Sequence, residues 1–389
     1  MPLPAALPGQ RVVLVMAEFF APAWKAGGTT AAITNLQRYF ASDDSLFFYI
    51  FCKARDMDNR LVIPKDKVNS WLPLPNGAIF YAEPPCLTAT MVRTIIEQTC
   101  PEVVYINGLF SKVFALHPLM ALRLHPRIKR VLASHGMLHE SALQIKPWKK
   151  KLYLGFLQRL GCFTGVQWQA TDEQEFKDVK RFAGRDAQVK LVPNIPKTPQ
   201  FLAADAAKKP QSLKLVFLSL ISEKKNLLYA LECLQQWSKP VQFDIYGPLK
   251  NAMYWKECEA FIATLPAHIQ VNYGGEVSPV AVQQTFRQYD ALLLPTTGEN
   301  FGYAIFECLS VGRPVVISDQ TPWRQLTEKK AGFDLPLEEP QTFIDALEHL
   351  WQMDEHHFDE WRQGAFALAT GYLAQHDYSA AYKQLFFNH

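Results

Sequence analysis

Two glutamates, Glu299 and Glu307, flank a glycine-bearing loop in the second half of the 389-residue chain. An apolar run, Ala291–Leu294, precedes the loop, and a helix-like segment, Tyr303–Val311, follows it and stops at Gly312. A strand, a glycine loop and a helix in this order direct backbone N–H groups and the positive end of the helix dipole at one spot, which suits phosphate. Glu307 lies in an otherwise apolar helix, where its carboxylate needs hydrogen-bond donors such as sugar hydroxyls. The pattern predicts a site for a ligand with phosphate and hydroxyl groups.

Four other residues would contribute to such a site, because each follows an apolar run that is typical of a buried strand. One of them is Lys225, which follows the run Leu215–Leu218. His135 would lie at a strand end, and the adjacent Gly27 and Gly28 permit close backbone approach to a ligand. The plain alternatives are a solvated lysine, a loop histidine and an ordinary glycine turn; for Lys225 and His135 the functional interpretation is favoured.

The elements that would position these residues are parallel strands separated by helices. The chain is long enough for two domains with full cores. The expected strands are Arg11–Met16, Leu46–Cys52, Val103–Ile106, Val131–Ala133, Val189–Val192, Leu215–Leu218, Phe243–Tyr246, Val271–Tyr273, Ala291–Leu294 and Pro314–Ser318. The sequence therefore predicts an α/β fold with two Rossmann-like domains, each built on a doubly wound parallel sheet.

A proline-rich break from Pro193 to Pro210 predicts the domain boundary. The expected domains are residues 1–193 and 194–370, followed by a C-terminal segment, 371–389. This segment either packs back on the first domain or forms the last helix of the second. Because ligands bind beyond the carboxyl ends of parallel strands, we expect the two glycine loops to face one ligand across a cleft.

The composition is that of an ordinary globular protein, and its seven cysteines form no CxxC pair. A disulfide framework or a zinc site is therefore not expected, and a reducing cytosol fits best. Neither a signal peptide nor a membrane-spanning run is expected. Residues 1–192 carry 24 Lys/Arg against 15 Asp/Glu, a balance of +9, whereas the remainder has a balance of −6. A basic half indicates either a docking surface for an anionic partner or solubility alone.

The spacing of Glu299 and Glu307 resembles the E-x7-E signature of glycosyltransferase family 4, whose members are retaining enzymes with the GT-B fold. The likeness covers nearly the whole chain and is strongest from Leu191 onward. Further similar stretches are Ala133–Leu138, Val192–Pro196, Ile245–Pro248 and Ile317–Trp323. The resemblance implies transfer of a sugar from a nucleotide-diphosphate donor in polysaccharide or glycoconjugate synthesis, with no metal and no resident cofactor.

The resemblance also implies a role for each matching residue. Glu299 would contact hydroxyl groups of the donor sugar, and Glu307 would bind the ribose of the nucleotide. His135 would contact the donor sugar or steady charge at the reacting carbon, and Gly27 and Gly28 would lie near the donor phosphates. The residues whose backbone N–H groups would face the diphosphate are Asn300, Phe301, Gly302 and Tyr303.

One position departs from the family pattern. Lys225 matches a lysine that grips the donor phosphates, but Leu220 stands where the family has an arginine. A leaving diphosphate gains charge as the glycosidic bond breaks, so the loss of one cation would cost several kcal/mol unless another side chain replaces it. Lys224 and Arg324 are the candidates for that replacement.

Two other motifs each allow a structural and a functional interpretation. Asp56-Met57-Asp58 forms a DxD, which binds metal in other glycosyltransferase folds, but turn-forming aspartates in a polar loop are favoured here. The stretch Lys146–Leu160 combines lysines with aromatic and aliphatic residues. It indicates either peripheral contact with anionic lipid or, more commonly, a charged helix end beside a core face. No nucleic-acid-binding module is recognisable.

Residues and resemblance together predict a metal-independent hexosyl- or other glycosyltransferase of the cytoplasm, held at the inner face of the membrane if the Lys146–Leu160 contact forms. The second domain would hold the donor, and the first would present a glycan or lipid-linked acceptor. Two alternatives stay open: a nucleotide-sugar-binding protein with weak or no transfer activity, which Leu220 motivates, and a sugar-nucleotide epimerase. The sugar, the base, the acceptor and the linkage do not follow from the sequence.

Overall fold

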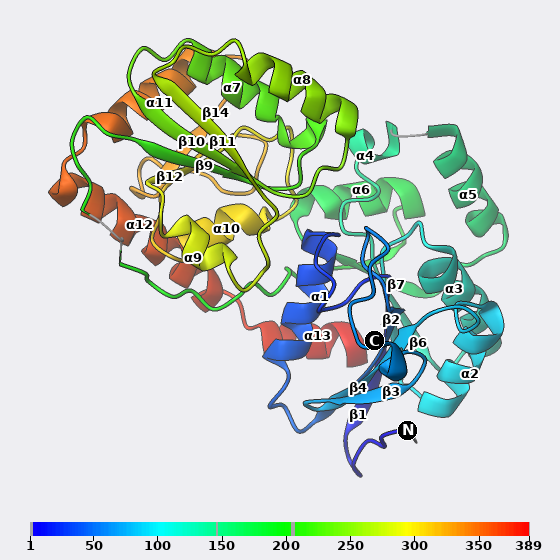
Figure 1. Cartoon of the computed structure of the whole chain (residues 1–389). Coiled ribbons are helices and arrows are strands. Elements are labelled where there is room, and N and C mark those ends of the chain that lie inside the picture. The colour runs from blue at the N-terminus through cyan, green and yellow to red at the C-terminus, as the bar shows by residue number, and fades with distance from the viewer. Residues whose placement is uncertain (1–2, 145–146, 204–206, 389) are drawn as a thin grey trace. The chain divides into compact units, whose positions relative to one another are not determined.

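The computed structural model of the chain describes residues 3–144, 147–203 and 207–388. The chain divides into two compact units, of which unit 1 is Met1–Ile195 with Asp377–His389, and unit 2 is Pro196–His376. Each unit is built on its own sheet with helices packed against it (Figure 1). The predicted α/β fold with two Rossmann-like sheets is confirmed.

The strands of unit 1 are β1 (Arg11–Ala17), β2 (Leu46–Lys53), β3 (Trp71–Leu74), β4 (Gly77–Ala82), β5 (Val103–Asn107), β6 (Lys129–Ala133), β7 (Val166–Ala170) and β8 (Gln188–Leu191). They form one sheet in the order β3-β4-β2-β1-β5-β6-β7-β8, in which β3 and β4 pair antiparallel and the other neighbours pair parallel. The strand order reverses between β1 and β5, which places a topological switch point there.

Three strands of unit 1, β3, β4 and β7, were not predicted. In β7, Gln167 and Gln169 interrupt the apolar pattern, although both side chains are buried. Their amide groups are satisfied inside the protein, because Gln169 Nε2 donates to Val192 O (2.8 Å) and Gln167 Nε2 donates to Gln188 O (3.1 Å). Burial of paired amides is compatible with a central strand but hides it from a search for apolar runs.

The helices of unit 1 are α1 (Gly28–Tyr39), α2 (Ala89–Thr99), α3 (His117–Ala121), α4 (Glu140–Gln144), α5 (Pro147–Arg159), α6 (Glu173–Ala183) and α13 (Tyr378–Phe387), with the short helices η1 (Lys65–Lys67), η2 (Lys112–Leu116) and η3 (Leu122–Leu124). The C-terminal helix α13 packs beside α1, where the rings of Phe40 and Tyr382 lie 6.2 Å apart. Phe386 of α13 also contacts Tyr105 of the sheet, with ring centroids 5.3 Å apart.

The strands of unit 2 are β9 (Lys214–Leu218), β10 (Val241–Tyr246), β11 (Ile269–Gly275), β12 (Ala291–Leu294), β13 (Val315–Ser318) and β14 (Gly332–Leu335). They form a parallel sheet in the order β11-β10-β9-β12-β13-β14, so its switch point lies between β9 and β12. Strand β14 was not predicted, because a glycine and an aspartate occupy two of its four positions.

The helices of unit 2 are η4 (Glu223–Lys225), α7 (Leu227–Gln235), α8 (Ala252–Ile262), α9 (Val282–Phe286), α10 (Tyr303–Leu309), α11 (Pro340–Gln352) and α12 (Glu355–Ala374). Helix α7 contacts α8 and α11, whereas α10 contacts α9 and α12, so two helical layers enclose the sheet (Figure 1). Leu292, Leu293 and Val316 are fully buried between these layers, which explains the uninterrupted apolar runs of β12 and β13.

The unit boundaries differ slightly from the predicted ones at 193/194 and 370/371. The first lies between Ile195 and Pro196. The second lies between His376 and Asp377, because α12 continues to Ala374 before the chain turns into α13. The C-terminal segment 371–389 is therefore shared between α12 and α13, which belong to different units.

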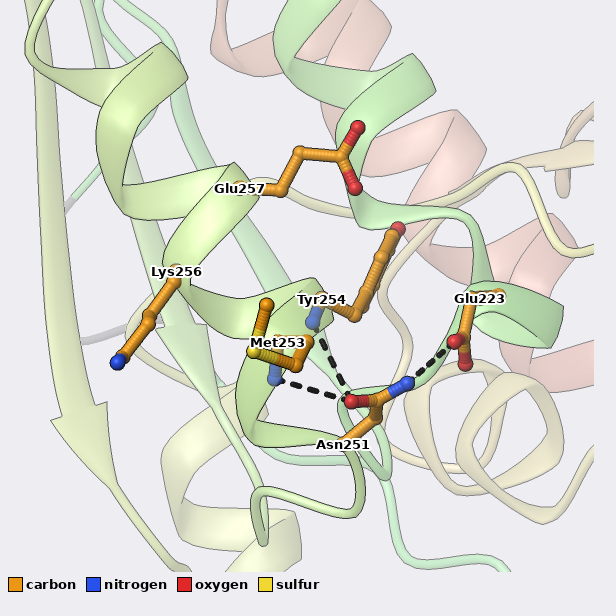
Figure 2. A pocket seen from close by; sticks show the side chains of 6 residues that line it. All are labelled: Glu223, Asn251, Met253, Tyr254, Lys256 and Glu257. Atoms are coloured by element: carbon orange, nitrogen blue, oxygen red, sulfur yellow. Dashed lines mark hydrogen bonds between the residues drawn. The ribbon is translucent and has the colours of Figure 1, made fainter.

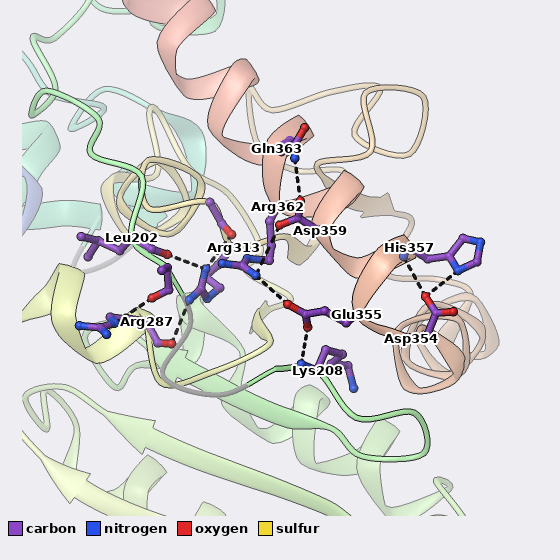
Figure 3. A network of polar contacts seen from close by, with 12 residues as sticks. Leu202, Lys208, Arg287, Arg313, Asp354, Glu355, His357, Asp359, Arg362 and Gln363 are labelled. Carbon is purple, nitrogen blue, oxygen red and sulfur yellow. Dashed lines mark hydrogen bonds and ion pairs between the residues drawn. The ribbon is translucent and has the colours of Figure 1, made fainter.

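A polar network connects Leu202 and Lys208, which follow the unit boundary, to the rest of unit 2 (Figure 3). Arg313 is 1% exposed and donates from Nη1 to Leu202 O (3.2 Å). The backbone N–H of Lys208 donates to the Glu355 carboxylate, which also pairs with Arg362. The network places the N-terminal segment of unit 2 against α12, upstream of β9.

Candidate functional site

The carboxyl ends of β9, β12 and β13 meet at the switch point of unit 2, and backbone hydrogen bonds join the three loops that follow them. Thr297 N donates to Lys224 O (2.8 Å), which connects the loop after β12 to η4. Glu299 N donates to Gln320 O (3.0 Å), which connects the same loop to the turn after β13. The predicted glycine loop is therefore held on both sides by its neighbours.

Lys225 and Glu299, two residues predicted from separate motifs, form an ion pair in this loop cluster. Their side chains are 19% and 10% exposed, so the pair is largely shielded from water. Such a pair is stable only while both partners are present, because either charge alone would be poorly solvated. A ligand that binds one of the two charged groups must therefore also provide a hydrogen-bonding or charged contact for the other.

A second cation, Lys224, lies against the same loop. A Cβ atom placed on Gly298 would lie 3.9 Å from Lys224 Cε, so this side chain passes over the loop at the position before Glu299. Burial of its ammonium group lowers the pKa of Lys224, the Glu299 charge raises it, and the charges of Lys225 and Lys250 lower it further. The other candidate for the missing cation, Arg324, instead lies 4.0 Å from Asp334 and is half exposed.

Glu307 lies on α10, as predicted, and has a protein partner that was not predicted. Lys197 Nζ donates to Glu307 Oε1 (2.5 Å) and to Pro279 O (2.9 Å). Burial raises the pKa of Glu307, and the nearby Lys197 opposes that rise. The Glu307 carboxylate thus receives its hydrogen-bond donor from Lys197, within unit 2. Lys197 lies in the proline-rich segment, so the sequence gives no indication that it belongs to the site.

The backbone of the loop enters α10 through Gly302, which has a φ of 77°. A side chain there is disfavoured twice, because an added Cβ would also lie 2.8 Å from Ile305 Cδ1. Helix α10 begins at Tyr303 and ends at Leu309, two residues before the predicted end. The first N–H groups of an α-helix have no acceptor within the helix itself.

The neighbouring predicted residues, Asn300 and Phe301, have different environments. The Asn300 side chain is partly exposed, whereas Phe301 is buried and packs against Phe306, with ring centroids 5.6 Å apart. Trp323 Nε1 donates to Phe301 O (2.6 Å), and this indole was not predicted as a site residue. Trp323 thereby fixes the backbone whose N–H groups the resemblance directs at the diphosphate.

The start of η4 is fixed by a polar contact with α8 beside a surface hollow (Figure 2). Asn251 Nδ2 donates to the Glu223 carboxylate, while Asn251 Oδ1 accepts from the N–H of Met253 (3.0 Å) and of Tyr254 (3.4 Å). Asn251 therefore caps α8 and anchors the turn that carries the two lysines.

In unit 1, the predicted glycine pair lies between β1 and α1. Gly27 has a φ of 70°, and α1 begins at Gly28. The Asp56 carboxylate accepts from the N–H groups of Trp24 (2.9 Å) and Lys25 (3.2 Å), which shapes the loop just before the glycines. This contact assigns Asp56 a structural role, in line with the favoured interpretation of the DxD.

His135 follows β6 and has a φ of 49°, a conformation that non-glycine residues seldom adopt. Its Nε2 lies 3.0 Å from Asn107 Oδ1 at the end of β5. The Glu175 carboxylate accepts from Ser134 Oγ (2.6 Å) and Gly136 N (2.7 Å), one residue on each side of His135. Burial lowers the pKa of His135, and the Glu175 charge opposes this shift.

The buried Glu175, only 2% exposed, was missed by sequence reasoning. Besides the contacts around His135, its carboxylate accepts from Thr171 N (2.9 Å) and Thr171 Oγ1 (2.7 Å). It lies in the first turn of α6 next to the exposed Glu173, so its sequence position suggests a helix start rather than a core carboxylate.

The structure therefore groups the predicted residues in two places. One cluster, at the switch point of unit 2, contains Lys225, Glu299, Asn300, Phe301, Gly302, Tyr303 and Glu307. The other residues, Gly27, Gly28 and His135, lie in unit 1 at the carboxyl ends of β1 and β6, the first of which borders the switch point of that sheet. Both locations are those at which doubly wound sheets bind ligands.

Solved structures with the same fold include a synthase and a galactosyltransferase. Sucrose-phosphate synthase from Thermosynechococcus elongatus superposes with a TM-score of 0.71 at 14% identity, over 97% of this chain and 99% of that chain. HepE from Anabaena, in complex with UDP and glucose, has a TM-score of 0.68 at 15% identity, over 97% and 98% of the two chains. The lipopolysaccharide outer core galactosyltransferase WaaB has a TM-score of 0.60 at 15% identity, over 97% and 99%. At such low identity these likenesses show the GT-B fold alone.

Similarity to a known family lies within the sequence of unit 2. No curated protein matches the chain. Residues 212–353 match the family described as glycosyl transferases group 1, and the matched region contains the loops after β9, β12 and β13. The part of unit 2 that holds these loops is therefore similar to the group 1 glycosyltransferases, and the chain as a whole has the GT-B fold.

Proposed function

We propose that unit 2 binds a nucleoside-diphosphate sugar and that unit 1 presents a hydroxyl group of a glycan or a lipid-linked sugar as the acceptor. The Lys225–Glu299 ion pair beside the Gly298–Tyr303 backbone is the observation that carries this proposal. A cation, a carboxylate and the start of α10 lie together at one switch point, which matches the charges of a diphosphate and the hydroxyls of a sugar.

In the proposed reaction, departure of the diphosphate leaves positive charge on the sugar and negative charge on the phosphates. Lys225 and Lys224 stabilise the phosphates, while Glu299 accepts hydrogen bonds from sugar hydroxyls in place of its contact with Lys225. The acceptor attacks the face from which the diphosphate departs, and a donor phosphate oxygen takes the acceptor proton. The enzyme contributes position and electrostatic stabilisation rather than a covalent intermediate.

Lys224 supports transfer activity despite Leu220. Its side chain crosses the loop at Gly298, so a second ammonium group lies within reach of a ligand held there. Burial is the largest cause of its lowered pKa, although the residue as a whole is exposed to solvent. A diphosphate would restore favourable electrostatic contacts to this group.

We propose uridine as the base, because similar folds hold UDP: HepE was solved with UDP and glucose, and the pneumococcal O-GlcNAc transferase GtfA with UDP and GlcNAc. The direct test is a thermal-shift panel of uridine, guanosine and adenosine diphosphate sugars, since a ligand that binds the native state raises its stability. We expect a uridine diphosphate sugar to raise the Tm most.

The panel is paired with an assay of nucleoside diphosphate release in the presence of saccharide and lipid-linked acceptors. Acceptor-dependent release supports the transferase. Stabilisation by a donor without release under any acceptor would favour a binding protein, and conversion of the donor without an acceptor would favour an epimerase. Absence of any shift with all three bases would contradict the proposed donor class.

A further inference from the structure

Helix α5 presents three large apolar side chains to solvent. Trp148 is 66% exposed, Leu152 is 69% exposed and Phe156 is 52% exposed. Because residues four apart lie one above the other on a helix, these side chains form one continuous stripe, which we name the α5 stripe. Isolated exposed apolar residues are ordinary, but three in helical register mark an interaction surface.

The opposite face of α5 is fixed in the core of unit 1, so the orientation of the stripe is determined. Leu154 and Leu157 are buried in that core, with 6% and 0% exposure. Tyr153 packs on Phe110 with ring centroids 5.9 Å apart, and Lys150 Nζ lies 5.1 Å from the same ring. A helix anchored on one face can bind a partner with the other without unfolding.

The charged residues of α5 itself are all basic. No Asp or Glu occurs between Glu140 and Asp172 in the sequence. Lys149, Lys151 and Arg159 are exposed on α5, and Lys149 Nζ lies 5.3 Å from the Trp148 ring. A surface that combines an aromatic and aliphatic stripe with lysines complements an anionic lipid surface. The aromatic and aliphatic side chains enter the headgroup region, and the ammonium groups contact lipid phosphates.

We propose that the α5 stripe docks unit 1 on the surface of a bilayer that contains anionic phospholipid, with α5 parallel to the membrane plane. Helix α5 has 13 residues, and among the described residues no helix is long and apolar enough to cross a membrane. The contact is therefore peripheral. The proposal rests on the surface alone and does not depend on the donor or on transfer activity.

The test is co-sedimentation of the full chain with vesicles of phosphatidylglycerol and phosphatidylcholine, compared with vesicles of phosphatidylcholine alone. We expect binding to the anionic vesicles that weakens when salt is raised from about 0.1 M to about 0.5 M. The variant Trp148→Ser/Leu152→Ser/Phe156→Ser should bind at least about tenfold more weakly. Its matched control is Leu7→Ser/Met57→Ser, which alters two exposed apolar residues elsewhere in unit 1.

The charge contribution is separated by a second matched pair. Lys149→Glu/Lys151→Glu and Lys65→Glu/Lys67→Glu change the net charge equally, and all four lysines are exposed in unit 1. Only the α5 variant should lose about tenfold or more in vesicle affinity. Equal losses from both variants, unchanged binding of the stripe variant, or no binding of the wild type would each overturn the proposal. A dimer that the stripe variant abolishes would also overturn it, because a second copy would then cover the stripe.

Discussion

The ammonium group of Lys225 pairs with the carboxylate of Glu299 and thereby joins the turn after β9 to the loop after β12. Each residue neutralises the other in a largely buried setting. A diphosphate sugar carries the complementary groups to both, since its phosphates attract the ammonium and its hydroxyls donate to the carboxylate. A bound donor would therefore replace the contact between Lys225 and Glu299 by two contacts of its own, one to the ammonium group and one to the carboxylate.

Replacing Lys225 by methionine should lower kcat by about 10²–10³-fold, because the cation acts most strongly when the diphosphate departs. Steady-state kinetics with the donor identified in the panel measures the change. Lys256→Met, at an exposed position of α8, is the matched control and should retain wild-type turnover. Normal turnover by Lys225→Met in a folded protein would remove Lys225 from the site.

We expect Lys224 to supply the positive charge that the family arginine would provide at the position of Leu220. Lys224→Met should lower turnover by about tenfold or more, and adding Leu220→Arg to that variant should restore part of the loss, because either cation can contact the phosphates. The informative quantity is the ratio of kcat/KM between the single and the double variant. If Leu220→Arg gives no recovery, Lys224 does not serve as the substitute.

Burial raises the pKa of Glu307, so its stability contribution has a defined sign with pH. The native carboxyl group holds its proton more tightly than the unfolded one, and stability is lost as pH rises above the ordinary value of 4.5. Glu307→Gln has no such loss. The free energy of unfolding of this variant relative to wild type should therefore increase with pH above 4.5, with a slope of at most about 1.4 kcal/mol per pH unit.

Urea unfolding at several pH values between the acid range and neutrality measures this slope. Glu259→Gln, at an exposed position of α8, provides the control and should track the wild type at every pH. A relative stability of Glu307→Gln that is flat or decreases with pH would show that Lys197 outweighs burial at this site.

Glu175 should act as a positioning residue for His135. Glu175→Gln removes a carboxylate that accepts hydrogen bonds on both sides of the histidine, so we expect a loss of about 1–3 kcal/mol in stability and a fall in kcat. Because the Glu175 charge raises the pKa of His135, this pKa should fall further below its ordinary value in the variant. An NMR pH titration of the His135 ring separates this effect from a loss of stability. Glu173→Gln, in the same turn of α6, is the control and should leave the pKa unchanged.

Sequence patterns predicted most strands with an uninterrupted apolar run and the loops that follow them, although β4 was missed despite such a run. Parallel strands buried on both faces must be apolar, so β9, β12 and β13 were found together with the residues at their ends. The pattern failed at β7 and β14, where buried amides or an aspartate find partners only in the folded chain. Lys197 and Glu175 were missed for the same reason, because their roles come from contacts with residues distant in sequence.

The central claim is that unit 2 holds the donor through Glu307 and the loop after β12, and titration calorimetry of the full chain with UDP and with UDP-sugars tests it most directly. The wild type should bind one equivalent, and Glu307→Ala should bind at least about tenfold more weakly, since a ribose hydroxyl would lose its carboxylate partner. Glu259→Ala should bind as the wild type does. Equal affinity of Glu307→Ala and the wild type would contradict the account.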